Sequence, residues 1–342
     1  MTGYRLVGET LVTGGEELVG QDCPKRMQFG PCGGVKPDGQ CEMRSGPCFF
    51  DDVVPWSGGI KQLPPVPAPL ILTDFSCAPF DPADVAAIAN ILAPSCDAVL
   101  VGDHQNRPDF PPTLMSRLIL DQGVTPWITL SCRDRNRIVL EQELVGLRFT
   151  GAKTVFCVTG DGRGYDVRPD VTQTFDLDGP RLVALAASLD MIAAVPETPT
   201  APPTHLRAAR LVEKQRAGAS VAVLNHVSSA STLSAFMDDA RTAGLRIPVL
   251  ASVAVFTDVV SAAVLQGLPG LELDSALVDE VVNAPDPIEA GIETAVGEAR
   301  QLLTINGIDG INLSGRASAS GTRRGAEIKA EVAARIRAAS GT

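Results

Sequence analysis

Short apolar runs recur along most of the chain, each followed by a polar turn and then by a segment with helical periodicity. Runs that are apolar on both faces and separated by helices are typical of a parallel sheet covered by helices. In the segment 135–149, for example, Leu140, Leu144 and Leu147 share one helical face, and Gly151 lies just past its end. Further helical patterns cover about 275–281 and 287–304. The runs predicted as strands are 70–73, 98–101, 127–130, 154–158, 191–194, 221–224, 248–251 and 310–313.

Eight such strand–helix units predict an α/β fold, a closed (β/α)8 barrel over residues 70–340, whose active site would lie at the C-terminal ends of the strands. The first 55 residues differ, because they are rich in Gly, Cys and charge and lack any long period. They are expected to form a small module that cannot bury a core by itself. Residues 56–69, with a run of prolines, predict an extended linker between the two parts.

The composition narrows the class of protein. The chain has 342 residues, 45% hydrophobic and 20% charged, with a formal net charge of -11. No apolar run approaches the roughly 18 residues of a membrane span, and no basic block suits nucleic acid, so neither membrane nor nucleic acid is an expected partner. Residues 1–20 contain three glutamates and no continuous apolar stretch, so the sequence predicts no secretory signal and a cytoplasmic location.

Polar and ionisable side chains follow five of the predicted strands, at positions that meet on one rim of a barrel. Carboxylates, guanidinium groups and amides from different strands would converge there, which indicates a binding or catalytic site. The alternative for any one of them is an ordinary polar loop or a helix cap, and capping of the following helix accounts for Asp134 equally well. The rim residues are Asp74, Asp103, His104, Gln105, Ser131, Cys132, Arg133, Asp134, Arg135, Asn136, Thr159, Gly160, Asp161, Asn225 and His226.

Familiar catalytic motifs are absent from the sequence. The glycine-rich segment 160–164 follows a strand but leads to Pro169 and Asp170 instead of a helix start, which argues against a dinucleotide-binding fingerprint. No Walker A lysine motif, GxSxG elbow or HExxH zinc motif occurs. The chain has three histidines, of which His205 is expected to begin a surface helix, so a histidine-based triad has few available parts.

Half of the eight cysteines lie within the first 48 residues. In a reducing compartment such a group indicates metal ligands more than disulfides, and four thiolates can close a tetrahedral zinc site. The spacing lacks the C-x2-C pair of common zinc ribbons, and buried free thiols or an iron–sulfur cluster are the alternatives. The candidate ligands are Cys23, Cys32, Cys41 and Cys48, whereas Cys77, Cys96, Cys132 and Cys157 are expected to be core residues.

Several motifs resemble the methylenetetrahydrofolate reductase family across roughly residues 69–315. The most specific is 129–138, T-L-S-C-R-D-R-N-R-I, close to the family's T-C-R-D-R-N-R-I. It is followed by V-T-G-D at 158–161 and F-D-L-D at 175–178. The segment G-D-H-Q at 102–105 resembles the family's T-D-N-Q. Lys214 with Ala217-Gly218-Ala219 resembles the family's K-x-x-A-G-A. The segments C-P-K (23–25), G-P-C-G-G (30–34), G-Q-C-E (39–42) and P-C (47–48) resemble a cysteine-rich module found at the C-terminus of acetogen-type methylenetetrahydrofolate reductase-associated proteins. Here that module is N-terminal.

The resemblance implies an oxidoreductase of one-carbon metabolism that reduces 5,10-methylenetetrahydrofolate to 5-methyltetrahydrofolate, with FAD or directly with NAD(P)H. The reaction needs a proton to open the ring and a hydride for the resulting iminium carbon. Asp74 stands at the position of the family's acid, and Asp161 corresponds to the aspartate near pterin and flavin, so both are expected to be catalytic. The residues expected to bind substrate or cofactor are Asp103, His104, Gln105, Arg133, Asp134, Arg135, Asn136, Thr159, Gly160 and Asn225.

The resemblance also implies a reduced folate, a tetrahydrofolate derivative, as the small-molecule partner. Zinc is favoured over an iron–sulfur cluster for the four thiols. For the protein partner two alternatives stay open: a homo-oligomer, or a partner subunit of a one-carbon complex.

Departures from the family motifs support a second hypothesis. Asp74 is one methylene shorter than the family's glutamate, and a displacement of about 1 Å can lower a rate about a hundredfold. Gly102 replaces a threonine, and Asn225 replaces a pterin-binding glutamine. The first hypothesis, a reductase, therefore includes a reductase without flavin. The second hypothesis is a folate-binding subunit, or a methyl-transfer or demethylation partner, without reductase activity. The third hypothesis is an unrelated barrel enzyme.

Overall fold

A computed structural model describes residues 22–59, 71–163, 167–267 and 271–340. Residues 1–21 of the predicted module and 60–69 of the predicted linker lie outside these ranges. The eight strands pair in parallel in chain order, and β8 pairs with β1 through Ile71 and Ile311, which closes the barrel and confirms the predicted fold. The strands are β1 (Ile71–Phe75), β2 (Ala98–Val101), β3 (Pro126–Ser131), β4 (Thr154–Val158), β5 (Ile192–Glu197), β6 (Val221–Leu224), β7 (Val249–Phe256) and β8 (Gly310–Ala317).

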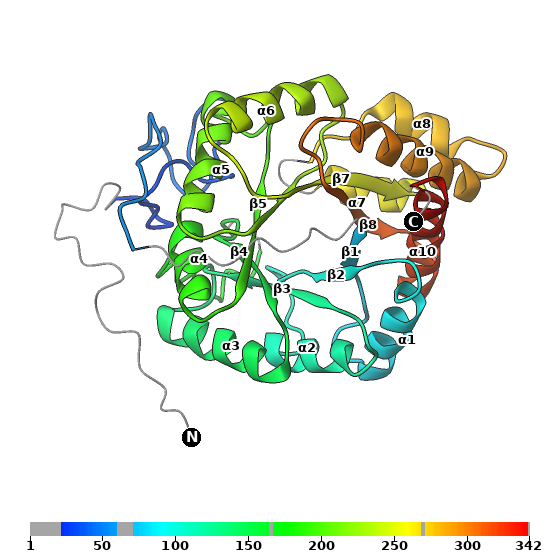
Figure 1. The fold of residues 1–342 in the computed structure, drawn as a ribbon, viewed down its shortest axis with the longest axis horizontal. Coiled ribbons are helices and arrows are strands. Elements are labelled where there is room, and N and C mark those ends of the chain that lie inside the picture. Colours follow the sequence, from blue (N-terminus) through cyan, green and yellow to red (C-terminus); the bar gives the residue numbers. More distant parts are fainter. Residues whose placement is uncertain (1–21, 60–70, 164–166, 268–270, 341–342) are drawn as a thin grey trace.

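Helices surround the barrel on the outside (Figure 1). A short 3-10 turn, η2 (Thr204–Leu206), precedes α5 and contains the exposed His205. The helices are α1 (Pro82–Leu92), α2 (Pro112–Leu120), α3 (Arg137–Thr150), α4 (Gly179–Ser188), α5 (Arg207–Arg216), α6 (Ala230–Thr242), α7 (Val259–Gln266), α8 (Ser275–Val282), α9 (Pro287–Leu302) and α10 (Thr322–Ser340).

Helix α3 illustrates how the sequence sets these boundaries. Leu140, Leu144 and Leu147 are fully buried, and Gly151 ends the helix in the left-handed conformation with φ 97°. The N-cap is Asn136, whose side chain accepts a hydrogen bond from the amide of Val139 over 3.0 Å. The expectation that Asp134 caps this helix is therefore wrong, because Asp134 lies two residues too early.

Apolar side chains cover both faces of the sheet, as the sequence pattern indicated. One cluster lies between strands and helices, and a second, containing Leu72, Trp127, Phe156 and Leu250, fills the inside of the barrel. The four cysteines of the barrel are buried and free of disulfides. Strands β7 and β8 extend four residues or more past the predicted runs 248–251 and 310–313, and carry polar residues such as Ser252 and Ser314 toward the rim.

Residues 22–59 consist of turns with one isolated bridge between Gln40 and Pro47. This segment, which joins the described part of the predicted module to residues 56–59 of the predicted linker, is called the module below. It lies beside α4 and α5, where Figure 1 shows it in blue. Arg207 and Arg210 of α5 donate to its backbone carbonyls, at Cys32 and Phe29, each over 2.9 Å. The module therefore covers one side of the barrel mouth.

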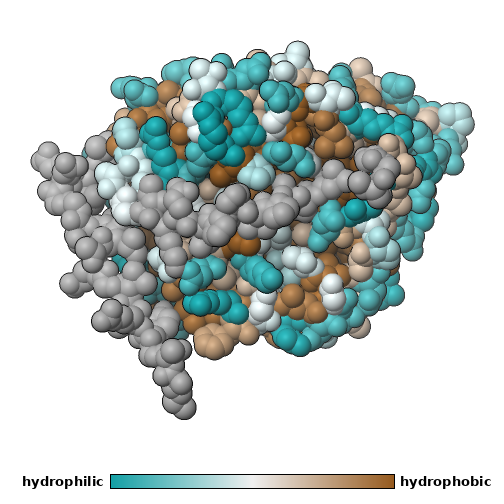
Figure 2. Space-filling model, viewed as in Figure 1, coloured by the Kyte–Doolittle hydropathy of each residue, from teal (hydrophilic) through white to brown (hydrophobic). Residues whose placement is uncertain are grey.

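No helix within the described ranges is long and apolar enough to cross a membrane. The face shown in Figure 2 carries hydrophilic side chains with smaller hydrophobic groups between them.

Candidate functional site

Two cavities open at the C-terminal ends of the strands, and Asp103 lines both. The first rim cavity has a volume of about 310 Å³ and is lined mainly by residues that follow β1, β2 and β3, including Phe75, His104, Gln105 and Arg135. The second rim cavity has a volume of about 250 Å³ and is lined by residues that follow β3 to β6, together with residues of the module. Its lining includes Ser131, Arg133, Thr159, Gly160, Asp161, Glu197, Lys214 and Asn225 from the barrel, and Lys25, Cys32 and Gly33 from the module.

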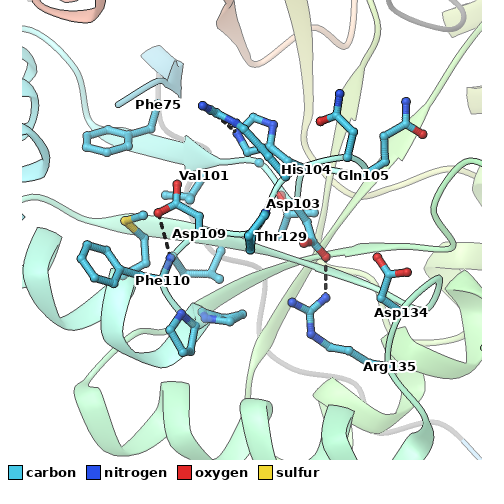
Figure 3. Close-up of a pocket in the computed structure, with 18 of the residues that line it drawn as sticks. Phe75, Val101, Asp103, His104, Gln105, Asp109, Phe110, Thr129, Asp134 and Arg135 are labelled. Atoms are coloured by element: carbon cyan, nitrogen blue, oxygen red, sulfur yellow. Dashed lines mark hydrogen bonds and ion pairs between the residues drawn. The ribbon is translucent and has the colours of Figure 1, made fainter. Parts of the chain in front are cut away.

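Asp103 is fixed in the wall between the cavities. Its carboxylate accepts from Arg135 over 2.5 Å and from the amide of Ser131 over 3.2 Å. In Figure 3, Asp103, Asp134 and Arg135 lie on one side of the first rim cavity, opposite the apolar Phe75, Val101 and Phe110. A flat ring could pack on the apolar side while its polar edge meets the carboxylates.

His104 lies on the rim of the same cavity. Burial, assisted by Arg107, lowers the pKa of its imidazole, and Arg107 donates to its Nε2 over 3.0 Å. The ring is therefore neutral at pH 7, and Nε2 is the acceptor.

Asp134 joins three rim loops through Arg163. Arg163 donates to both oxygens of Asp134 over 2.6 and 2.8 Å, and to the carbonyl of Gln105 over 2.5 Å. Arg133 donates to Asp134 over 3.0 Å; the residue is 3% exposed, and its Nη2 has no hydrogen-bond partner within the described ranges. Although burial would raise the pKa of Asp134, the two arginines hold it below its usual range.

Asp161 lies on the Thr159–Gly162 loop after β4 and lines the second rim cavity. Solvent reaches its side chain, yet the surrounding protein raises the pKa of the carboxyl by desolvation, with Glu42 adding to this and Lys25 and Arg133 opposing it. Gly160 is required here, since its φ is +92° and a Cβ would lie 2.3 Å from Ser131 Oγ. This loop thus carries a carboxyl that can hold a proton at a higher pH than an ordinary aspartate.

Asp74 lies elsewhere in the barrel mouth. Its carboxylate accepts from Asn312 Nδ2 over 3.0 Å, from Ser314 Oγ over 3.1 Å and from the amide of Gly315 over 3.0 Å, all on β8. It lines neither rim cavity. The structure therefore brings Asp103 and Asp161 together at one cavity and places Asp74 where β1 meets β8, outside the lining of both rim cavities.

Of the remaining predicted rim residues, some belong to the cavities and some do not. Asn225 lines the second rim cavity and donates to Thr198 Oγ1 over 2.9 Å. Asn136 caps α3, and His226 is buried against Glu298 of α9, with 2.7 Å between Nε2 and the carboxylate. Neither lines a rim cavity.

The four thiols of the module, Cys23, Cys32, Cys41 and Cys48, line one small cavity of about 20 Å³. The amide of Met43 donates to Cys41 Sγ over 3.4 Å, and none of the thiols forms a disulfide. Within the described ranges, however, no three side chains of His, Cys, Asp or Glu are grouped closely enough to hold a metal ion.

Sequence reasoning missed several residues of the cavities. The sequence indicated Arg163 only as part of a glycine-rich segment and Lys25 only as part of the cysteine motif, and neither was predicted as a site residue. Glu197 ends β5, is 4% exposed and pairs with Lys214 over 2.8 Å. A charged residue that ends a buried strand is the signal that could have identified Glu197.

The comparisons with known proteins agree with this architecture. Residues 99–315 match the family described as methylenetetrahydrofolate reductase, and residues 13–64 match the family described as methylene-tetrahydrofolate reductase C terminal. No curated protein matches the chain.

Among solved structures, a Clostridium thermocellum protein described as binding two copies of 5-methyl-5,6,7,8-tetrahydrofolic acid has a TM-score of 0.56 and 12% identity, covering 79% of this chain and 95% of its own. A Mycobacterium tuberculosis tryptophan synthase structure gives a TM-score of 0.46 and 13% identity, covering 78% and 92%. At these identities the first likeness concerns the fold alone.

The fold and the rim together define a (β/α)8 barrel protein with a ligand site at the C-terminal ends of its strands. The first family match spans more than half of the chain, so the protein belongs to the methylenetetrahydrofolate reductase family and carries in addition the domain otherwise known from the family's C-terminus.

Proposed function

We propose that this protein reduces 5,10-methylenetetrahydrofolate to 5-methyltetrahydrofolate, with the hydride supplied directly by NAD(P)H. The chain belongs to this family, and the observation that carries the proposal is its pair of rim cavities. Asp161, Thr159 and Asn225 line the second rim cavity, and Asp103 separates it from the first rim cavity. Two adjoining cavities suit a reaction in which the reduced pterin and the hydride donor must meet.

Asp161 is the proton donor favoured by the geometry. A general acid must reach the substrate and hold its proton more firmly than an ordinary carboxyl does, and Asp161 combines a raised pKa with a place in the cavity lining. The proton would go to one of the two folate nitrogens that the methylene carbon joins, as the bond between that nitrogen and the carbon breaks. The hydride from NAD(P)H then forms the new C–H bond and leaves NAD(P)+. Asp74, at the acid position implied by the resemblance, is the alternative donor.

Most of the cations that line the second rim cavity are engaged by the protein itself. Here Arg207 donates to the carbonyls of Ala201 and Cys32, each over 2.9 Å, and Arg210 to that of Phe29. Lys214 is held by Pro196 and Glu197. Arg133, whose Nη2 has no partner within the described ranges, is the cation of this cavity that could meet an anionic group of a bound ligand. The replacement of the family's flavin-side threonine by Gly102 is what favours direct use of NAD(P)H over a resident flavin.

The module would hold one zinc ion. Its four thiols supply the donor set of a structural zinc site, and they line one small cavity of about 20 Å³. Cys23, Cys32, Cys41 and Cys48 would have to draw together around the ion. A bound zinc would stabilise a segment that has little regular structure of its own.

The test is a pair of measurements on freshly purified full-length protein. Titration calorimetry with 5-methyltetrahydrofolate should show binding, and NAD(P)H oxidation should depend on methylenetetrahydrofolate, with no flavin bands in the visible spectrum. Binding without oxidation would support the folate-binding or methyl-transfer alternative. That alternative is favoured by Asp74, which stands where the family has a glutamate. Absence of both would contradict the proposal, and flavin bands would contradict the direct use of NAD(P)H.

A further inference from the structure

We propose that Lys25 and Glu42 of the N-terminal module are positioning residues that hold the Gly160–Gly162 loop, and with it Asp161, in the geometry that binds the reduced folate. The inference rests on the proposed function for its ligand. It makes the module a part of the site, in addition to any role as a metal-bound stabilising unit.

Lys25 crosses from the module to the barrel. Its Nζ donates to the carbonyl of Gly160, the residue before Asp161, over 2.8 Å, and also pairs with the carboxylate of Glu42. The side chain is 4% exposed, and its Nζ lies 5.6 Å from the centroid of the Phe175 ring. A lysine is rarely buried this far unless its charge is satisfied, and here the Gly160 carbonyl and Glu42 satisfy it.

Glu42 holds the same loop from the other side of Asp161. One of its oxygens pairs with Lys25, and the other accepts from the amide of Gly162 over 3.1 Å. The approach is close: a Cβ on Gly162 would lie 2.6 Å from Met43 Cγ. The residues on both sides of Asp161 are therefore fixed by two side chains that belong to the module.

The module has other attachments to the barrel that do not involve these two side chains. The amide of Gln28 donates to Asp178 Oδ2, the N-cap of α4, over 2.9 Å, and the amide of Trp56 donates to Glu213 Oε2 over 2.6 Å. Arg207 and Arg210 add the backbone contacts described above. A variant at Lys25 should therefore keep the module docked, so that its effect on the loop can be measured in a folded protein.

The experiment compares Lys25→Met, Lys25→Arg and Glu42→Ala with wild type and with Lys36→Met. Lys36 is a lysine of the same module that is exposed and lines neither rim cavity, which makes it a matched control. Hydrogen exchange of the peptide covering 158–163 is measured without ligand, and 5-methyltetrahydrofolate affinity is measured by calorimetry. We expect Lys25→Met and Glu42→Ala to speed exchange in this peptide and to weaken binding at least tenfold. Lys25→Arg should restore part of both, and Lys36→Met should match wild type.

The two readouts separate the possible failures. Unchanged exchange in Lys25→Met and Glu42→Ala would overturn the inference that the module holds the loop. Faster exchange with unchanged folate affinity would overturn the positioning role. If wild type binds no folate and oxidises no NAD(P)H, the proposed function fails, and the exchange data still decide whether Lys25 and Glu42 hold the loop. If Lys25→Met does not fold, Glu42→Ala carries the same test.

Discussion

Asn312 of β8 donates a hydrogen bond from Nδ2 to the carboxylate of Asp74 on β1, over 3.0 Å, where the first and last strands close the barrel. Leu72, two residues before Asp74, belongs to the cluster inside the barrel, so Asp74 faces inward as well. Ser314 and the amide of Gly315 complete three donors to the same carboxylate. The residue at the family's acid position thus holds two strands together.

The variants Asp74→Asn and Asp161→Asn should therefore affect different properties, the first stability and the second turnover. An asparagine at position 74 cannot accept from all three donors, and we expect it to lower the free energy of unfolding by about 1–3 kcal/mol while turnover of the folded protein falls less than tenfold. Asp161→Asn should lower turnover about a hundredfold with little effect on stability, because it removes the proposed acid. Urea unfolding and NAD(P)H oxidation at saturating folate measure both. The opposite result in turnover would identify Asp74 as the acid.

Asp134 holds the rim loops together through two arginines, and Asp134→Asn should lower the stability of the folded protein. The substitution leaves Arg133 and Arg163, both almost fully buried, without their shared counter-charge. Because Asp134 itself is 27% exposed, we expect a loss of about 2–4 kcal/mol in the free energy of unfolding, somewhat below that of a fully buried pair. The exposed pair of Arg168 and Asp170 is the control, and Asp170→Asn should leave urea unfolding unchanged. Equal effects of the two substitutions would show that the Asp134 pair contributes no more than a surface ion pair.

Much of the barrel could be predicted from the sequence, because a parallel strand buried on both faces is an apolar run whatever its neighbours are. The run 154–158 and strand β4 coincide for this reason. The ends of β7 and β8 were missed because polar residues such as Ser252 are paired across the closed barrel, and pairing leaves no periodic signal. Asn136 rather than Asp134 caps α3, a choice set by the backbone at the loop and not by residue type.

The site was predicted less completely, for a physical reason. Strand ends gave Asp103 and Asp161, since parallel strands point their ends to one rim. Contacts between distant segments have no local pattern, so the approach of Lys25 to Gly160, 135 residues away, could not be inferred. His226 follows a strand but turns to Glu298 and not to a cavity, because the carboxylate on α9 and the carbonyl of Glu272 accept from both ring nitrogens.

His226 gives the folded state a pH dependence with a definite sign. Burial alone would lower its pKa, but Glu298 and the Glu272 carbonyl raise it above the usual value. The interaction therefore stabilises the fold fully below a pH of about 6.5, the unfolded value, and its contribution is lost as pH rises through the higher folded pKa. His226→Gln should remove this slope and cost roughly 1–2 kcal/mol at low pH. Urea unfolding from pH 5 to 9 measures it, and an unchanged slope in the variant would contradict the assignment.

Zinc in the module is tested by elemental analysis of protein expressed with zinc and purified without chelators. We expect about one zinc per chain, since the four thiols that line this cavity can close one tetrahedral site. Cys32→Ser should lose most of the metal, whereas Cys77→Ala, a cysteine buried in the barrel, should retain it. Because metal binding in such modules is coupled to folding, a strong chelator should also lower the thermal midpoint of wild type but not that of Cys32→Ser. Iron in place of zinc, or equal metal content in the two cysteine variants, would contradict the zinc assignment.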